Sequence, residues 1–167
     1  GLHPMAGKET SGLASSSENL FAGANLVITF APQTEESALI EAREYAALMG
    51  FGRITECSAE EHDKKIALTS QLAHLVSNAY VKSPSVSHCE GFTGGSFQDM
   101  TRIAGVDETM WAQLYMFNRK NILAELDCLL RHLESYRSAI AEDDESALSF
   151  ELRQGRLIRE TIKRDKN

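Results

Sequence analysis

DETMWAQLYMFNRKNILAELDCLLRHLESYRSAIA, residues 107–141, decides the fold class of this 167-residue chain. Asp107 can accept hydrogen bonds from the first free amides of a helix, so it predicts a helix start. Apolar residues then recur at spacings of three and four, with one interruption near Asn118. They are Trp111, Leu114, Ile122, Leu126, Leu129, Leu133, Tyr136 and Ile140. This stripe is too apolar for a lone helix. We expect either a seam within one chain or a facing helix from a second subunit.

The helical pattern extends to both sides of this stretch. The run Ser58-Ala59-Glu60-Glu61 is a capping box, which predicts a helix from there to about residue 82. A loop and a short helix over 96–105, capped by Ser96, are expected next. Residues 143–166 predict a last, highly charged helix that is interrupted at Gly155. The chain is therefore mainly α-helical from about residue 58.

The first 57 residues have a mixed α/β pattern. LVITF at 26–30 and RITEC at 53–57 are short β-rich runs, and each predicts a strand. Between them, Thr34 can cap a helix that Gly50 ends. The apolar stripe of this helix consists of Leu39, Ala42, Ala46 and Met49.

Composition and charge limit the classes of function. The chain is 43% hydrophobic and 25% charged, which is typical of a folded protein with its own core. Its net charge of -7 argues against nucleic acid as a partner, and no apolar run has the length of a membrane span. No secretory leader is expected from the first residues, and the distant cysteines Cys57, Cys89 and Cys128 fit reduced thiols in the cytoplasm. No G-x-G-x-x-G fingerprint and no P-loop is present.

Three short islands are rich in polar groups: HPMAG at 3–7, TSQLAH at 69–74 and GGSFQDMTR at 94–102. In the third island, the amides of a helix N-terminus and the guanidinium of Arg102 suit a carboxylate, so we expect a small anionic ligand. The alternatives are that Arg102 forms a surface salt bridge and that His3 belongs to a disordered chain end.

The predicted 58–82 helix carries four small or polar residues at spacings of four, three and four: Asp63, Ala67, Ser70 and His74. They share one face, which either lines a pocket or is a solvated stripe. The apolar face would consist of Leu68, Leu72, Leu75 and Ala79. His62 and His74 do not have the spacing of metal ligands, so no metal site is expected.

Together, these islands resemble the prephenate/arogenate dehydrogenase family of tyrosine biosynthesis. The matching segments, in order, are His3–Gly7 with Glu9, Ser11-Gly12 and Asn19-Leu20-Phe21, then His62-Asp63, Ser70–His74, Gly95–Ala104 and Met110-Trp111. They correspond to the family's H-P-[MI]-A-G, H-D, S-[HQ]-L-x-H, G-G-x-F-x-D-x-T-R-I-A and M-W elements. Gln71 departs from the pattern, because many relatives have histidine there. A proton relay through this position is therefore not expected.

The resemblance implies a Rossmann-like domain followed by a helical dimerisation domain similar to the C-terminal domain of 6-phosphogluconate dehydrogenase. Residues 1–57 would be the C-terminal part of the nucleotide-binding domain, with its last strands and helix. Residues 58–167 would be the all-helical dimerisation and substrate-binding domain. The glycine fingerprint of the first Rossmann half has no counterpart here, so the main cofactor site is expected to be absent. We expect a fragment of a longer enzyme, inactive by itself.

The implied activity is that of a cytoplasmic, homodimeric prephenate dehydrogenase. It would convert prephenate to 4-hydroxyphenylpyruvate and CO₂ with NAD or NADP, and arogenate dehydrogenase or an inactive dimer-forming helical module are the alternatives. His3 resembles the family's catalytic base, and Arg102 resembles its substrate-carboxylate ligand. The substrate-binding residues implied by the resemblance are Arg102, His74, Gly95, Trp111, Thr101 and Ser70.

Overall fold

The computed structural model describes residues 1–8 and 12–164, with side chains to residue 162. Glu9 and Ser11 of the first motif, and the expected end of the last helix at Lys166, lie outside the described residues. The chain divides into two compact units, Gly1–Ile122 and Leu123–Asn167. This division does not coincide with the expected domain boundary at 57/58, which stays a prediction. Each unit is described by itself below.

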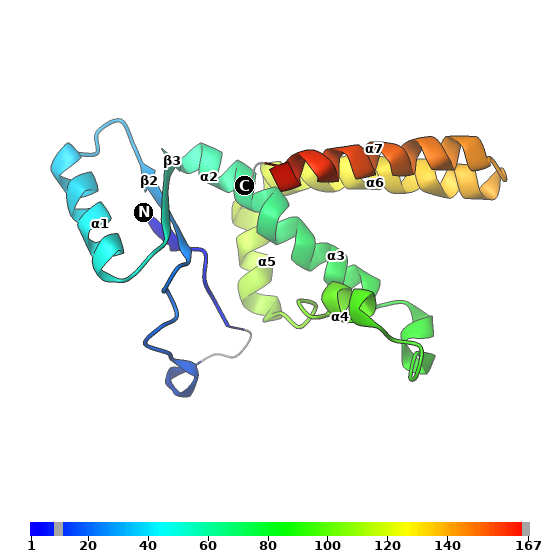
Figure 1. The fold of residues 1–167 in the computed structure, drawn as a ribbon, viewed down its shortest axis with the longest axis horizontal. Coiled ribbons are helices and arrows are strands. Elements are labelled where there is room, and N and C mark those ends of the chain that lie inside the picture. The colour runs from blue at the N-terminus through cyan, green and yellow to red at the C-terminus, as the bar shows by residue number, and fades with distance from the viewer. Residues whose placement is uncertain (9–11, 165–167) are drawn as a thin grey trace. The chain divides into compact units, whose positions relative to one another are not determined.

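The first unit begins with a three-stranded sheet in the order β1-β2-β3 (Figure 1). Its strands are β1 (Leu2–Pro4), β2 (Asn25–Phe30) and β3 (Arg53–Ser58). β1 is antiparallel to β2, whereas β2 and β3 are parallel and are joined through helix α1 (Glu36–Leu48). A parallel pair with a helical crossover is a βαβ unit, which confirms the α/β prediction for this segment.

The core of this sheet consists of Leu26, Ile28 and Ala46, each at most 2% exposed, with Leu39 and Ala42 packed against them. The predicted stripe of α1 is thus confirmed except at its end, where Met49 is 49% exposed.

The two expected ends of α1 have different outcomes. Thr34 does not cap the helix: its hydroxyl accepts a hydrogen bond from the Ala31 amide at 2.9 Å, and the N-cap residue is Glu35. The Thr34 hydroxyl oxygen is therefore bonded within the preceding turn, and it does not cap α1. Gly50 follows the helix at φ 80°, a left-handed conformation that favours glycine, and confirms the predicted stop.

Helical segments make up most of the remaining first unit. They are η1 (Leu13–Ser15), α2 (Ala59–Ile66), η2 (Ala67–Leu72), α3 (Ala73–Tyr80), η3 (Pro84–His88), α4 (Gly95–Thr101) and α5 (Glu108–Phe117). Two predicted caps are confirmed: the Ser58 hydroxyl accepts from the Glu61 amide at 3.1 Å, and Asp107 accepts from the Met110 amide at 2.8 Å. The predicted cap at Ser96 is wrong, because α4 begins one residue earlier, at Gly95, with Gly94 as its N-cap.

The long helical stretch is interrupted where its apolar stripe is interrupted. α5 ends at Phe117, and α6 (Arg119–Ala141) begins after Asn118, whose backbone leaves the helical conformation at φ -104° and ψ 25°. The Asn118 side chain is buried and donates to the backbone carbonyl of Asp63 and to Oε1 of Gln71, both at 2.8 Å. The interruption thus places the side-chain amide of Asn118 where it bonds to both α2 and η2.

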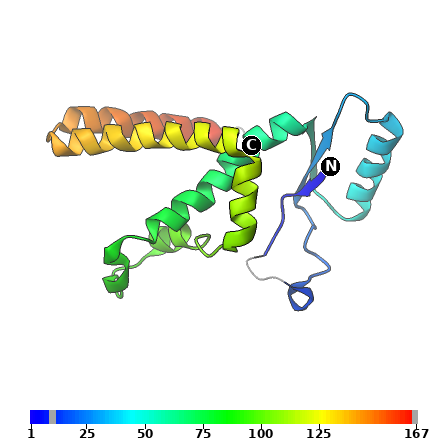
Figure 2. The same ribbon diagram turned by 180° about the vertical axis from the view of Figure 1, so that it is seen from behind.

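The second unit is a helical hairpin of α6, from residue 123, and α7 (Glu145–Arg164), which lie side by side in Figures 1 and 2. Asp144 caps α7 by accepting from the Ala147 amide at 2.9 Å. The predicted interruption at Gly155 is wrong: α7 continues through it, since one exposed glycine costs a helix only about 1 kcal/mol. Although α6 has 23 residues, no helix among the described residues has both the length and the apolarity to cross a membrane.

Candidate functional site

A cavity of about 340 Å³ lies within the first unit, between β1, α2, η2 and α5. Three residues predicted for the site line it: His3, Ser70 and Trp111. Its volume is within the range of small-molecule sites, and most of its exposed lining is apolar. A larger hollow of about 540 Å³ is lined only by residues of α7, so it is the surface of a single helix rather than an enclosed site.

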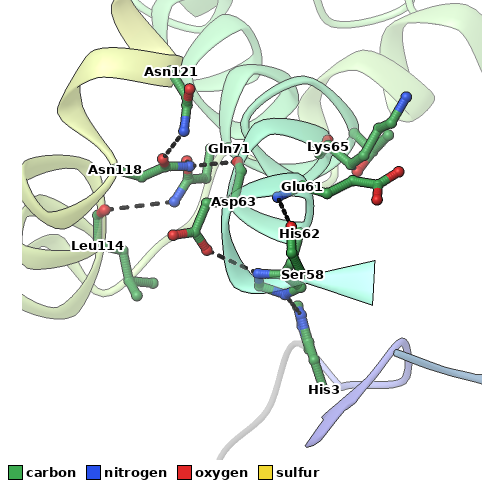
Figure 3. A network of polar contacts seen from close by, with 11 residues as sticks. His3, Ser58, Glu61, His62, Asp63, Lys65, Gln71, Leu114, Asn118 and Asn121 are labelled. Carbon is green, nitrogen blue, oxygen red and sulfur yellow. Dashed lines mark hydrogen bonds and ion pairs between the residues drawn. The ribbon is translucent and has the colours of Figure 1, made fainter. Parts of the chain in front are cut away.

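His3 is held in the sheet, where it pairs with Val27 across the antiparallel strands. The alternative that it belongs to a disordered end is therefore wrong. Its Nδ1 lies 2.7 Å from Nε2 of His62, and the two ring centroids are 5.0 Å apart (Figure 3). Burial lowers the pKa of His3 below its usual 6.5, and the neighbouring His62 lowers it further. The ring is thus favoured in the neutral form that can accept a proton.

Because the pKa of His3 is lowered in the folded chain, the unfolded chain binds this proton more readily. The stability that His3 contributes is complete above about pH 6.5 and is lost as pH falls through its lowered pKa. We expect the free energy of unfolding in urea to fall between about pH 7.5 and about pH 5.5, and to fall less in a His3→Asn variant. Equal pH dependence in the two proteins would contradict the perturbed environment of His3.

His62 and Asp63 are adjacent residues of α2 that contact each other through their side chains. Nδ1 of His62 lies 2.8 Å from Oδ1 of Asp63 (Figure 3). The sequence analysis excluded His62 as a metal ligand and matched it, with Asp63, to the family's H-D motif, but it gave His62 no role in the site. The available signal was its place one turn after the Ser58 cap, within the H-D motif. Its contact with His3 joins positions 59 residues apart, which no local pattern indicates.

The helix that carries Ser70 is not a regular α-helix. Residues 67–72 form the π-helical segment η2, which inserts an extra residue into the turn. The four-residue spacing used in the sequence analysis therefore fails: Ala67 is fully buried, whereas Leu68, expected on the apolar face, is 53% exposed. Gln71 is buried and lines the cavity instead. Gln71 and Asn118 were both missed as site residues.

His74 and Trp111 bring α3 and α5 together beside the cavity. Their ring centroids are 4.1 Å apart at an interplanar angle of 32°. Nδ1 of His74 lies 2.9 Å from the Ser70 carbonyl, which can only accept, so Nδ1 carries a proton and donates it to this carbonyl. His74 is thus adjacent to the cavity through Trp111, without being one of its lining residues.

The remaining predicted residues, Gly95, Thr101 and Arg102, belong to α4 and its C-terminal cap. Two side chains of α3 fasten this segment: Ser77 donates to the Met100 carbonyl at 2.6 Å, and Asn78 donates to the Ala104 carbonyl at 3.1 Å. Ser77 and Asn78 lie one turn of α3 after His74, and the segment that they attach carries Arg102, whose side chain is exposed.

These three residues do not line the cavity of His3. The Thr101 hydroxyl donates to the Phe97 carbonyl at 2.8 Å, within its own helix. Gly95 and Arg102 lie at opposite ends of α4, which is about 10 Å long. A common carboxylate site made from the helix N-terminus and Arg102 therefore stays a prediction.

Residues 58–154 match the family model described as the prephenate dehydrogenase dimerization domain. The chain belongs to the prephenate dehydrogenase family. Of the relatives, the cyclohexadienyl dehydrogenase of Zymomonas mobilis is 32% identical over 98% of this chain and 57% of its own length. The prephenate dehydrogenase of Bacillus subtilis is 31% identical over 86% of this chain and 40% of its own. The chain thus spans about half the length of these relatives.

A solved structure supports the same assignment to the prephenate dehydrogenase family. The prephenate dehydrogenase from A. aeolicus, in complex with hydroxyphenyl propionate and NAD+, superposes with a TM-score of 0.80 at 28% identity. The match covers 96% of this chain and 58% of that chain. The resemblance inferred from the motifs is confirmed, and so is the mainly helical fold after a short α/β segment.

Proposed function

We propose that this chain supplies the substrate-binding and proton-accepting half of a dehydrogenase that converts prephenate to 4-hydroxyphenylpyruvate and CO₂. The observation that carries this proposal is the cavity that His3 shares with Trp111 in a member of this family. Arogenate, which has an amino group in place of the keto group, is the alternative substrate. We refer below to the enzyme that combines these residues with a nicotinamide-nucleotide-binding domain as the holoenzyme.

The reaction removes a hydride from the ring carbon that bears the 4-hydroxyl group, and the ring carboxylate leaves as CO₂. In this proposal, His3 accepts the hydroxyl proton at Nε2, the ring nitrogen opposite its contact with His62, as the hydride leaves. His3 returns this proton to the same oxygen when loss of CO₂ has made the ring aromatic. Its lowered pKa keeps the imidazole neutral before the reaction. Trp111 and Ser70 border the ring of the bound substrate, and water is excluded by the apolar lining.

Arg102 binds a substrate carboxylate in this proposal, and His74 and the Gly95 backbone add polar contacts. Two features support it. The segment that carries Arg102 is attached, at Met100 and Ala104, to the turn of α3 that follows His74. His74 also stacks on the cavity residue Trp111. Thr101, whose hydroxyl is bonded to Phe97, acts by shaping the helix that precedes Arg102.

The cofactor does not fit the residues that the structure describes. A dinucleotide needs a glycine-rich turn between a strand and a helix to cradle its pyrophosphate, and the turn between β2 and α1, residues 31–35, reads APQTE. NAD or NADP is therefore proposed for the holoenzyme, where it would accept the hydride. We expect no NADH from prephenate with these 167 residues alone.

The binding half of this proposal can be tested without cofactor, because Trp111 is the single tryptophan of the chain and lines the cavity. We expect prephenate and 4-hydroxyphenylpropionate to change its fluorescence saturably, and 3-phenylpropionate, which lacks the hydroxyl group, to bind more weakly. Titration with arogenate distinguishes the two candidate substrates. No saturable change with any of these ligands would contradict the proposal.

We also propose a homodimer formed through α6 and α7. These helices expose large apolar side chains: Leu133 at 50%, Ile140 at 65%, Phe150 at 60%, Ile158 at 62% and Ile162 at 50%. Leu126, Leu129 and Tyr136 of the predicted stripe are partly buried. In this proposal, the partly buried residues of the stripe form a seam within one chain, and its exposed residues contact a helix of the second subunit.

An Ile158→Asp substitution is expected to convert the dimer to a monomer, because a carboxylate would be buried unpaired in the interface. The side chain is 62% exposed in the single chain, so the fold should survive the change. Light scattering after size exclusion measures the mass, and circular dichroism checks the fold. Leu48→Asp, at an 83% exposed position of α1, is the matched control and should leave the mass unchanged. A dimeric Ile158→Asp variant would contradict the proposed interface.

We place the holoenzyme in the cytoplasm, because all three cysteines, Cys57, Cys89 and Cys128, are free thiols. The number of reactive thiols can be measured in the cell lysate and in protein purified without reductant. We expect three reduced cysteines in both samples, and oxidised cysteines in the lysate would contradict this placement.

A further inference from the structure

Three side chains at the wall of the cavity form an unbroken line of polar contacts, and the proposed function leaves two of them without a role. Nδ1 of His3 lies 2.7 Å from Nε2 of His62, and Nδ1 of His62 lies 2.8 Å from Oδ1 of Asp63 (Figure 3). His3 comes from β1, whereas His62 and Asp63 come from α2. All three line the cavity.

The order of these contacts fixes where the protons are. A carboxylate only accepts hydrogen bonds, so the contact with Asp63 places a proton on Nδ1 of His62. In the neutral form of the His62 ring, Nε2 then has a lone pair. The proton between the two rings must therefore come from Nδ1 of His3, and Nε2 of His3 is left unprotonated.

We propose that His62 and Asp63 are positioning residues that hold His3 in the tautomer whose Nε2 is the base. This inference rests on the proposed function, in which His3 accepts the hydroxyl proton of the substrate. When that O–H bond breaks, the proton goes to Nε2 and the His3 ring becomes a cation. Its Nδ1–H then donates a charge-assisted hydrogen bond to His62, whose own Nδ1–H remains bonded to the Asp63 carboxylate.

Buried groups fix the turn that carries this pair. The backbone carbonyl of Asp63 accepts from the Asn118 amide at 2.8 Å, and Asn118 is itself held by Gln71 and by Asn121, each at 2.8 Å (Figure 3). The His62 side chain is 19% exposed, so its ring has little freedom to turn away from His3. Asp63, with a side chain that is 54% exposed, reaches the pair from the solvent side.

The tautomers can be read directly by long-range ¹H–¹⁵N NMR of the 167-residue chain labelled at histidine, without substrate or cofactor. We expect both His3 and His62 to carry the proton on Nδ1, with exposed His132 as the internal reference. In Asp63→Asn, the amide can donate as well as accept, so the tautomers of both rings should become mixed or reversed. A wild-type His3 protonated on Nε2, or a His3 spectrum that Asp63→Asn leaves unchanged, would overturn the proposal.

Kinetics of the holoenzyme separate positioning from packing. His62→Leu removes the acceptor for His3 Nδ1–H and should lower kcat about 10- to 100-fold with little change in the KM for prephenate. His62→Gln retains an oxygen that reaches about as far as Nε2, and should recover most of the lost kcat. His132→Gln is the control for loss of a histidine and should match the wild type.

Wild-type kcat in His62→Leu, or equal losses in the Leu and Gln variants, would overturn the positioning role. Because the NMR measurement needs no turnover, a wild-type holoenzyme that fails to oxidise prephenate would count against the proposed function alone. The two failures are therefore distinguishable.

Discussion

His3→Asn is expected to lower kcat of the holoenzyme for prephenate by about 10²- to 10⁴-fold, the range that general bases contribute. The Asn amide can occupy the place of the imidazole Nδ1 and donate to Nε2 of His62, so the contact that is 2.7 Å long in the wild type can persist. The variant loses only the nitrogen that would accept the proton. Substrate binding, followed by Trp111 fluorescence, should therefore change about threefold or less.

The matched control is His88→Asn, at an exposed position of η3. It should have wild-type kcat, because His88 does not line the cavity. A His3→Asn enzyme with kcat within about threefold of the wild type would mean that another group, or water, accepts the proton.

Arg102→Ala is expected to raise the KM for prephenate by about 10- to 100-fold, because a charge-assisted bond to a carboxylate contributes about 1.5–3 kcal/mol. Arg102→Lys should give a smaller rise, since it retains the charge and loses the two-pronged geometry of the guanidinium. Initial rates over a range of prephenate concentrations measure both effects.

The control for loss of a surface arginine is Arg137→Ala. Arg137 pairs with Glu134 at 3.0 Å, but both side chains are more than 60% exposed, so little change in KM or stability is expected. An unchanged prephenate KM in Arg102→Ala would contradict the carboxylate role and would favour a dehydrogenase for a different hydroxy acid.

The parts of the fold that depend on local contacts could be predicted from the sequence. The caps at Ser58 and Asp107 each bond to an amide three residues away, so the spacing alone indicates them. The interruption of the apolar stripe near Asn118 was visible, because a polar residue replaces an apolar one there. The expectation of one long helix over 107–141 is nevertheless wrong, since the helix ends at Phe117 and a second begins at Arg119. The strands of the βαβ unit were likewise indicated by short β-rich runs.

The parts that depend on distant contacts could not be predicted in this way. The π-helical segment η2 shifts the faces of the helix by one residue, which buries Gln71 and exposes Leu68, and no spacing rule anticipates that shift. The contact of His3 with His62 forms only when β1 adds to the sheet beside β2. The family motifs indicated His3 as a functional residue and included the His62-Asp63 pair, but they did not indicate the contact between His62 and His3.

The most direct test is a crystal structure of the holoenzyme with 4-hydroxyphenylpropionate and the oxidised cofactor. The proposed function requires the phenolic oxygen to lie about 2.6–3.2 Å from Nε2 of His3 and the ring to lie beside Trp111. A ligand that occupies the cavity with its phenolic oxygen directed away from His3, or one that binds elsewhere, would contradict it.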